Sequence, residues 1–498
     1  MLKVRRNPYM RISKTSYMAG LQCRKLLWTR IHEPDLLVED DDSKRVFTTG
    51  QEVGLYARKL FPNGIAIDTT LSIPDRIKAT QAALTQRKPI YEAAICSGNL
   101  YAQIDILVPV SSGWDIVEVK SSAKIHDHYY QDVAFQKYVC DKSGLPIRQC
   151  RIATINGDYI KRGPIKVNKL FNLNSISKEV AKVIRDVPRS VAVMIRALGT
   201  KCYKIDIGPH CSSPHSCPLQ SHCWAFLPKH NVFELYRIGA RAYEFMEQGI
   251  LRIRDIPADT PMSRYQSIQV KCVKTGKPYI NPEAIIEFMD DLEYPVRFLD
   301  FESFSTPIPI NDGTKPYQQI PFQYSLHILP RLKAKPVHYE FLAEGRDDPR
   351  PALLSNLKKH IGSSGTILAF SMTFEKSRLK EMAEAFPDHR QWIKDALPRF
   401  KDLIAPFRRA AYYHPDQHGS NSLKQVMPAL TDRSYDNMDI AGGSAAADEF
   451  MRVTFGDVSD AERKRVHSQL LRYCKQDAGG MIDILRELHQ TSRINGIT

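Results

Sequence analysis

The sequence predicts an α/β protein with two domains, at residues 1–225 and 291–498, joined by a helical connector at residues 226–290. Two strand-like runs followed by a helical pattern occupy residues 100–144, which is the alternation expected of an α/β domain. A second apolar strand pattern begins at Val296 and opens another alternation of strands and helices. At 498 residues the chain is too long for one ordinary hydrophobic core.

Composition indicates a globular protein with a polyanionic partner. The content of 43% apolar and 25% charged residues is that of soluble domains. Neither a membrane-spanning run nor an apolar segment behind the basic N-terminus is present, so we expect no membrane contact, no secretory signal and a cytoplasmic location. The net charge is +15, and the first thirty residues hold eight Lys/Arg and no Asp or Glu. This predicts nucleic acid as the partner, and the alternative is a basic tail without a specific role.

Three charged residues lie on two expected neighbouring strands, Leu100–Val110 and Trp114–Ser121. Glu118 and Lys120 are two residues apart and therefore share one face, and strand pairing would bring Asp105 beside them. Such charges make a poor core, but they can hold a divalent metal and activate water. The alternative is a solvent-facing stripe on an edge strand.

The segment after these strands has helical spacing up to Gly144 and contains Gln136. A strand–turn–strand–helix order carrying D…ExK…Q resembles the RecB-like branch of the PD-(D/E)XK nucleases. The resemblance implies a restriction-endonuclease-like domain in which Asp105 and Glu118 ligate a metal. Lys120 would be the catalytic lysine, and Gln136 would help to hold the site.

Two further carboxylates flank this set. Asp132 lies one turn before Gln136 and would either join the site or be an exposed helix charge. Glu92 lies upstream, where a strand-edge carboxylate is its expected role.

Ten cysteines in a chain without a secretory signal predict free thiols or metal ligands in place of disulfides. Three of them form the spacing Cys211-x5-Cys217-x5-Cys223 in a segment rich in Pro, Ser and His, which suits a loop around a bound group. Three thiolates need a fourth ligand for tetrahedral zinc or a cubane cluster, and Cys23 is the best candidate. The scattered remainder are expected to be core thiols: Cys96, Cys140, Cys150, Cys202, Cys272 and Cys474.

One N-terminal cysteine with three distal ones resembles the iron–sulfur clasp of RecB-like nucleases. The resemblance implies a structural [4Fe–4S] cluster that pins the ends of the first domain together. Zinc is the less favoured alternative, in which His210, His215 or His222 would replace Cys23 as a ligand.

The connector contains ELYRIGARAYEFMEQGILRIRDI, whose spacing predicts a helix that ends near Gly249. After it, Asp300 and Glu302 lie near the end of an apolar strand that begins at Val296. With one residue between them, these carboxylates face the same way, and their repulsion favours a bound cation.

Two later motifs complete a pattern. A strand at Ile367–Phe370 precedes an amphipathic helix with Glu375, and Tyr473 and Asp477 lie one turn apart on another helix. The order resembles the tyrosine subclass of the DEDD, or DnaQ-like, 3′–5′ exonucleases, whose fold is RNase H-like.

The resemblance implies that Asp300, Glu302, Glu375 and Asp477 ligate metal, while Tyr473 orients the attacking water. Glu375 departs from the Asp usual in that family, which puts the geometry of this ligand in question. Two further residues have minor expected roles. Asp402 would either support a metal ligand from behind or end a strand, and Lys424 would lie near the path of a phosphate.

Together the motifs resemble a bacterial fusion of an iron–sulfur RecB-like nuclease with a DnaQ-like exonuclease. We therefore expect a Mg²⁺- or Mn²⁺-dependent deoxyribonuclease with two centres, acting in repair, recombination or defence. In each centre, two metals about 4 Å apart would stabilise the attacking and leaving oxygens. Two alternatives stay open: a nucleic-acid-binding protein with one or both sites degenerate, and an exonuclease that acts on RNA.

Overall fold

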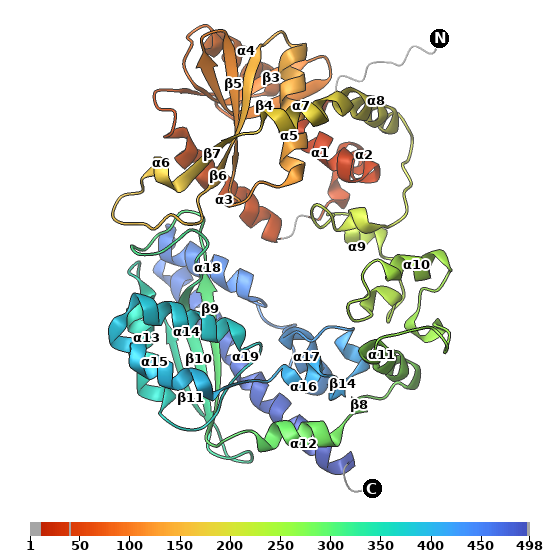
Figure 1. Ribbon diagram of the computed structural model, residues 1–498, viewed down its shortest axis with the longest axis vertical. Coiled ribbons are helices and arrows are strands. Elements are labelled where there is room, and N and C mark those ends of the chain that lie inside the picture. The colour runs from red at the N-terminus through yellow and green to blue at the C-terminus, as the bar shows by residue number, and fades with distance from the viewer. Residues whose placement is uncertain (1–10, 39–40, 496–498) are drawn as a thin grey trace. The chain divides into compact units, whose positions relative to one another are not determined.

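The chain forms a mixed α/β structure of two compact units (Figure 1). A computed structural model describes residues 11–38 and 41–495. The first unit takes residues up to 226 together with 306–318, and the second takes the rest. Among the described residues, no helix combines the length and apolar character needed to cross a membrane. Three of the eight basic residues near the N-terminus lie outside the described residues: Lys3, Arg5 and Arg6.

The first unit is built on a seven-stranded mixed sheet in the order β2-β3-β4-β5-β6-β7, with β1 paired to β4. Its strands are β1 (Ile12–Ser13), β2 (Ile65–Ala66), β3 (Ile90–Ser97), β4 (Leu100–Val110), β5 (Gly113–Lys120), β6 (Ile147–Ile155) and β7 (Phe171–Ser175). Its helices are α1 (Lys14–Gln22), α2 (Arg24–His32), α3 (Asp41–Arg58), α4 (Ile73–Leu84), α5 (Asp127–Lys142), α6 (Val167–Leu170), α7 (Ser177–Val183), α8 (Val187–Leu198) and α9 (Gln220–Cys223).

The predicted hairpin and helix at residues 100–144 are confirmed. β4 and β5 pair in an antiparallel ladder, and β5 continues through α5 into β6, which runs parallel to it. α5 ends before Gly144, whose φ of +80° suits glycine. One apolar core includes side chains of α1, α5 and α8, and a second includes side chains of α3.

The second unit has a five-stranded mixed sheet in the order β11-β10-β9-β12-β13 and a two-stranded sheet of β8 and β14. Its strands are β8 (Tyr279–Ile280), β9 (Val296–Phe304), β10 (Ile320–Leu329), β11 (Val337–Leu342), β12 (Ile367–Ala369), β13 (Phe400–Asp402) and β14 (Tyr412–Tyr413). Its helices are α10 (Arg241–Glu247), α11 (Arg264–Thr275), α12 (Pro282–Asp290), α13 (Pro349–Ile361), α14 (Thr373–Ala385), α15 (Arg390–Ala396), α16 (Ala405–Arg408), α17 (Leu423–Leu430), α18 (Gly443–Phe455) and α19 (Asp460–Asn495).

The central strand β9 is the axis of this unit. It pairs antiparallel with β10 and parallel with β12. Alternate residues serve two cores: Phe298 packs in the core that includes α19, whereas Leu299 and Phe301 pack in the core that includes α13 and α14. The sheet is therefore covered on both faces, and its polar side chains gather where β9 approaches its end.

Two expectations were wrong. The connector helix is shorter than its periodicity predicts, because Arg237 and Gly239 have φ of +51° and +58°, which no α-helix accommodates, so helix α10 begins only at Arg241. Cys202 is exposed and is not a core thiol, and Cys96 is only half-buried.

A buried histidine pair on the five-stranded sheet predicts acid sensitivity. His327 of β10 stacks on His338 of β11 with ring centroids 4.3 Å apart. Burial, reinforced by the neighbouring cations, lowers the pKa of His327 to about 3 and that of His338 to about 4. Unfolded histidine titrates near 6.5, so below that pH the unfolded chain binds more protons than the folded chain.

The contribution of this pair to stability is therefore expected to fall as pH drops from about 6.5 toward 4. For His327 the loss at pH 4.5 is up to about 2–3 kcal/mol. Relative to the wild type, His327→Gln should have a higher Tm at pH 4.5 for a given Tm at pH 7, measured by thermal melting. The control is His360→Gln on α13, and equal slopes for both variants would contradict the prediction.

Candidate active sites and cysteine cluster

Strand register brings the carboxylates of the first unit together. Ile106 of β4 pairs with Val117 of β5, so the next residues across the ladder are Asp105 and Glu118. Asp105 is fixed by its Oδ2, which accepts a hydrogen bond of 2.8 Å from the Val119 backbone N–H. The neighbourhood expected from strand pairing is therefore present.

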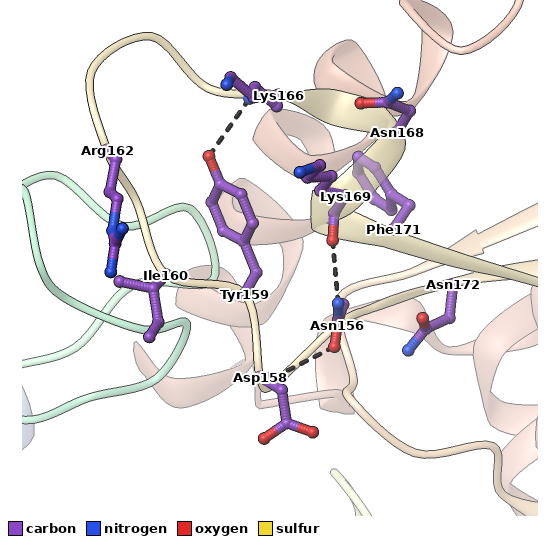
Figure 2. Close-up of a pocket in the computed structure, with 10 residues that line it drawn as sticks. All are labelled: Asn156, Asp158, Tyr159, Ile160, Arg162, Lys166, Asn168, Lys169, Phe171 and Asn172. Atoms are coloured by element: carbon purple, nitrogen blue, oxygen red, sulfur yellow. Dashed lines mark hydrogen bonds between the residues drawn. The ribbon is translucent and has the colours of Figure 1, made fainter.

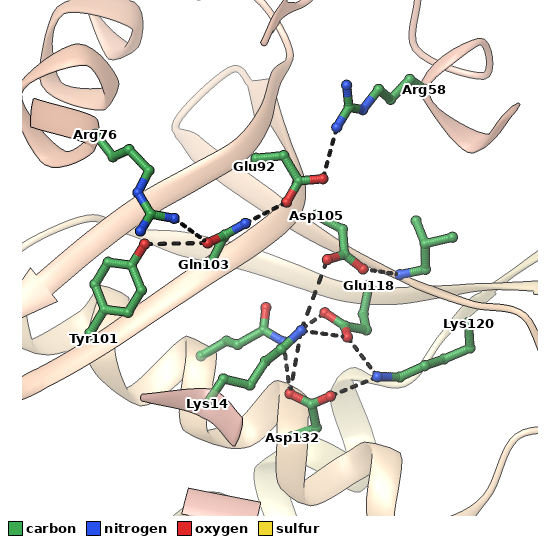
Figure 3. A network of polar contacts seen from close by, with 12 residues as sticks. Lys14, Arg58, Arg76, Glu92, Tyr101, Gln103, Asp105, Glu118, Lys120 and Asp132 are labelled. Carbon is green, nitrogen blue, oxygen red and sulfur yellow. Dashed lines mark hydrogen bonds and ion pairs between the residues drawn. The ribbon is translucent and has the colours of Figure 1, made fainter. Parts of the chain in front are cut away.

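Glu118 is the centre of a buried polar network (Figure 3). Lys120 donates to its Oε1 at 2.7 Å, and Gln136 of α5 donates to its Oε2 at 2.6 Å. Asp132 also belongs to this network: it accepts from Lys120 at 2.7 Å and from Gln136 at 3.0 Å, and it is only 5% exposed. Of the two expectations for Asp132, the structure supports membership of the site.

Lys14, the first residue of α1, is the residue that the sequence did not indicate. Its Nζ lies 2.9 Å from Glu118 Oε1 and 3.9 Å from carboxylate oxygens of Asp105 and Asp132 (Figure 3). In the sequence, Lys14 is one of eight basic residues near the N-terminus, and no motif distinguishes it from the others. Three carboxylates thus surround two ammonium groups, Lys14 and Lys120.

These charges shift the pKa values of Asp105 and Glu118 in opposite directions. Burial and the Glu118 charge raise the pKa of Asp105 to about 7. Burial also acts to raise the pKa of Glu118, but Lys120 and Lys14 hold it below its ordinary value. Perturbed groups with specific charge partners are typical of functional sites.

Glu92 flanks this network on β3. It accepts from Arg58 at 2.8 Å and from Gln103 at 2.7 Å, and its register position is opposite Asp105 (Figure 3). Its φ of +59° is unusual for a residue with a side chain and indicates local strain. Glu92 is therefore a strand carboxylate neutralised by Arg58.

The four predicted cysteines converge on one small pocket, which His210 also lines. Cys23 lies between α1 and α2, whereas the other three thiols come from the segment 211–223. Gln22 connects the two regions, since its Nε2 donates to the backbone oxygens of His210 and His215 at 2.9 and 2.8 Å. His215 and His222 do not line this pocket, so His210 is the remaining histidine candidate.

Loss of one thiol in this pocket is expected to destabilise the first unit. A bound metal group would close a loop of nearly 190 residues between Cys23 and Cys211, and metal-binding energy of this kind is folding energy. Cys217→Ser should lower the free energy of unfolding by about 3 kcal/mol or more. Chemical denaturation measures the effect, with the exposed Cys202→Ser as the matched control. Equal stability of the two variants would contradict a clasp.

In the second unit, the predicted residues converge on a pocket of about 630 Å³. Asp300 and Glu302 reach it from β9, and Glu375 reaches it from the first turn of α14. Tyr473 and Asp477 complete it from one face of α19. All five residues predicted for this site are therefore brought together.

The carboxylates of this pocket repel one another. Burial raises the pKa values of Asp300, Glu302 and Glu375 well above their ordinary values, and neighbouring carboxylates raise them further. Asp477 is raised to a pKa of about 6, again by burial. Lys424 acts to lower the pKa values of Glu302 and Asp477, yet the pKa values of all four carboxylates remain above their ordinary values.

Hydrogen bonds hold the carboxylates from behind. Tyr435 donates to Asp477 Oδ1 at 2.6 Å, and the Tyr473 hydroxyl also bonds to Asp477. Cys474 Sγ lies 3.4 Å from Asp300 Oδ2. Tyr435 and Cys474 are additional residues that the sequence analysis missed, and Cys474 had been assigned to the core.

Glu375 and Asp402 have contrasting environments. The Oε2 atom of Glu375 is buried and has no hydrogen-bond partner among the described residues, although the side chain is only 3% exposed. Asp402 ends β13, where its Oδ1 accepts from the backbone N–H groups of Ser371 and Ile404 at 2.8 and 3.3 Å. Asp402 is thus a strand-end residue, whereas Glu375 has an oxygen available for a ligand.

A separate basic pocket of about 370 Å³ lies in the first unit around the end of β6 and the start of β7 (Figure 2). Three cationic side chains and one carboxylate line it, together with apolar or aromatic side chains and several amides: Arg162, Lys166, Lys169, Asp158, Tyr159, Ile160, Phe171, Asn156, Asn168 and Asn172. None of the candidate catalytic carboxylates lines it. Its chemistry suits an anionic ligand such as a phosphate chain.

Comparison with known proteins gives relatives without a described activity. Residues 297–422 match a domain of unknown function, DUF2779. This segment includes Asp300, Glu302 and Glu375 and stops before Tyr473 and Asp477.

Similar sequences also occur in Mycoplasma and Ureaplasma species. The chain is 23% identical to uncharacterized protein MG366 of Mycoplasma genitalium over 38% of its own length and 31% of that protein. It is 22% identical to uncharacterized protein UU173 of Ureaplasma parvum over 41% of its length and 32% of that protein. The chain thus spans about a third of the length of these relatives.

Proposed function

We propose that this protein is a metal-dependent nuclease that hydrolyses DNA phosphodiester bonds at two separate centres. The first unit would be a RecB-like PD-(D/E)XK domain, and the second a DnaQ-like exonuclease domain with an RNase H-like fold. The mixed sheets, with the acidic motifs on β4, β5 and β9, support this assignment.

One observation carries the proposal: four carboxylates, three of them buried and Asp300 half-buried, share the second-unit pocket. Asp300, Glu302, Glu375 and Asp477 come from three elements distant in sequence and line the same pocket. Gathering like charges in a low-dielectric site is costly unless a cation compensates them. The buried Glu375 Oε2 atom has no hydrogen-bond partner among the described residues, and a cation would satisfy it.

These four residues fit Mg²⁺ or Mn²⁺, because hard divalent cations prefer carboxylate oxygens. When bound, the metal would supply Lewis-acid activation of water and neutralisation of the developing charge. Tyr473 is hydrogen-bonded to Asp477 and lines the pocket, so it would orient the attacking water. Lys424 is placed to attract the phosphate chain.

In the first unit, Asp105 and Glu118 would ligate the metal, and Lys120 would position or polarise the attacking oxygen. Gln136 and Asp132 hold Glu118 and Lys120 in place through the hydrogen bonds described above. The ammonium of Lys14 lies among the same carboxylates, so a bound cation has to displace it.

For the cysteine cluster we propose a structural [4Fe–4S] centre, since four thiols line one pocket. Zinc, held by the four thiols or with His210 in place of Cys23, is the alternative that these donors allow. Protein purified without oxygen distinguishes the two: a brown colour with iron and sulfide supports the cluster, whereas colourless protein whose zinc content falls by one in Cys217→Ser overturns it.

The excess positive charge and the basic pocket support a nucleic acid as substrate, bound through its backbone. The test is digestion of end-labelled DNA and RNA in Mg²⁺ or Mn²⁺. DNA cleavage that is lost only when both Lys120→Ala and Asp300→Ala are present supports two working centres. Loss in one single variant indicates one centre, RNA-only cleavage changes the substrate, and no cleavage by the wild type overturns the proposal.

A further inference from the structure

A cluster of candidate metal ligands lies in the second unit, outside the carboxylate pocket. His230, Glu234 and His418 each present one ligand atom, and these atoms lie within 4.8 Å of one another. The first two residues lie at the start of the connector segment, whereas His418 comes from the loop between β14 and α17. We propose that these three residues form a structural zinc site that joins the two segments.

The carboxylate of Glu234 is held ready for such a role. Its Oε1 accepts from Asn231, from the backbone N–H at 3.3 Å and from the side chain at 2.9 Å. Its Oε2 therefore turns toward the histidines, at 2.7 Å from His418 Nδ1 and 3.8 Å from His230 Nδ1. Hydrogen bonds behind a ligating group are typical of metal sites.

The two histidines are held in an unusual way. Their rings are nearly parallel, with centroids 5.1 Å apart and an interplanar angle of 13°. Both residues have left-handed backbone, with φ of +55° at His230 and +48° at His418. Such conformations are unfavourable for residues other than glycine, and they cluster at ligand-binding sites.

A hydrogen bond between Glu234 and His418 alone does not account for this arrangement. At 3.8 Å, His230 Nδ1 is too far from Glu234 Oε2 for a hydrogen bond, although it faces the same oxygen. Two imidazoles and one carboxylate are a donor set that zinc accepts, with water in the remaining position. The side chains are 20–33% exposed, so an ion can enter.

The contact between the two segments is close. A Cβ atom at Gly419 would lie 1.8 Å from the Glu234 backbone oxygen, so only glycine fits beside His418. Gln269 is fully buried and fixes the other side, donating to that oxygen at 2.7 Å and accepting from the Tyr236 backbone N–H at 2.9 Å.

The three candidate ligands lie close in sequence to residues that line the carboxylate pocket. Tyr236 and Arg237 follow Glu234, while Asn421 and Ser422 follow His418, and all four line that pocket. Zinc would therefore fasten two walls of the pocket without contacting the hydrolytic centre. Zinc binding at this site does not depend on cleavage of nucleic acid by the protein.

The test uses the full chain, stripped with chelator, desalted and titrated with Zn²⁺ and separately with Co²⁺. Zinc per chain after dialysis should fall by one in His418→Ala and in His230→Ala relative to the wild type. His489→Ala on α19 is the matched control and should retain the wild-type content. Co²⁺ should give a visible spectrum with nitrogen and oxygen ligation that His418→Ala lacks, apart from any thiolate signal of the cysteine cluster.

Should His418→Ala fail to fold, the near-isosteric Glu234→Gln carries the test, because its amide oxygen still accepts the hydrogen bonds from Asn231 while an amide is a weaker zinc ligand than a carboxylate. We expect zinc affinity at this site to fall about tenfold or more in Glu234→Gln. Zinc should also raise the Tm of the wild type and not that of the folded variants. Equal zinc content and equal affinity in wild type, Glu234→Gln and a folded histidine variant would overturn the proposal and leave only a hydrogen bond.

Discussion

Asp300→Asn is expected to abolish hydrolysis at the second-unit site and, at the same time, to stabilise the metal-free protein. The expected loss in kcat is roughly a thousandfold or more, because a ligand that concentrates the metal's charge at the scissile phosphate is removed. The free energy of unfolding of the metal-free protein is expected to rise by about 2 kcal/mol, which corresponds to roughly 3–6 °C in Tm for a unit of this size. Stability and activity should thus change in opposite directions.

The gain in stability follows from the electrostatics of the pocket. Asp300 lies among Glu302, Glu375 and Asp477, and the buried charges of these carboxylates oppose one another. The amide removes one charge while keeping the side-chain shape. Strained or repulsive groups at functional sites are commonly less stable than their inactive replacements.

Thermal melting with and without Mg²⁺ measures this prediction. The wild type should gain Tm with Mg²⁺, and Asp300→Asn should gain much less, since it lacks one ligand. Asp347→Asn, which removes an exposed carboxylate of the same unit, is the matched control and should leave the Tm near that of the wild type. A lower Tm for metal-free Asp300→Asn would show that Asp300 has a structural role instead.

At the first-unit site, Lys120→Ala and Lys14→Met are expected to have opposite effects although each removes one positive charge. Lys120→Ala should reduce cleavage about a hundredfold to a thousandfold, since it removes the group that we propose positions the attacking oxygen. Lys14→Met should tighten Mg²⁺ binding about tenfold, because the Lys14 ammonium lies among the carboxylates that the metal would use.

The stability of Lys14→Met provides a second readout. Without metal, Glu118 loses a buried partner at 2.9 Å, so the Tm should fall, and Mg²⁺ should restore it. Cleavage is best measured in an Asp300→Asn background, which leaves the first-unit site as the only centre expected to act. Equal Mg²⁺ affinity in Lys14→Met and the wild type would mean that Lys14 does not compete with the metal.

These two predictions rest on a difference between the sites that the motifs alone do not reveal. In the first unit, two lysines hold the pKa of Glu118 down, and only the pKa of Asp105 is raised among the two proposed metal ligands. In the second unit, the pKa values of all four carboxylates remain raised. We therefore expect the proposed second-unit site to depend more on a bound cation, even though Glu375 departs from the Asp of the exonucleases that the motifs resemble.

Periodicity determined most of the local structure. The alternation around Asp105 and Glu118 predicted β4 and β5, and the spacing of Tyr473 and Asp477 predicted one helix face, because strand and helix repeats are properties of the chain itself. The connector was predicted less well. The positive φ at Arg237 interrupts the helix there. Apolar periodicity does not predict such a backbone conformation, because it depends on tertiary contacts.

The sequence by itself determined the α/β class and the motif residues: Asp105, Glu118 and Lys120, the four cysteines, and the Asp300 to Asp477 series. Only the tertiary structure decided what surrounds them. Lys14, Tyr435 and Cys474 join the sites from distant elements, and His230, Glu234 and His418 meet although 184 residues separate Glu234 from His418. The physical reason is that backbone periodicity depends on near neighbours, whereas charge compensation and ligand geometry depend on side chains that only packing brings together.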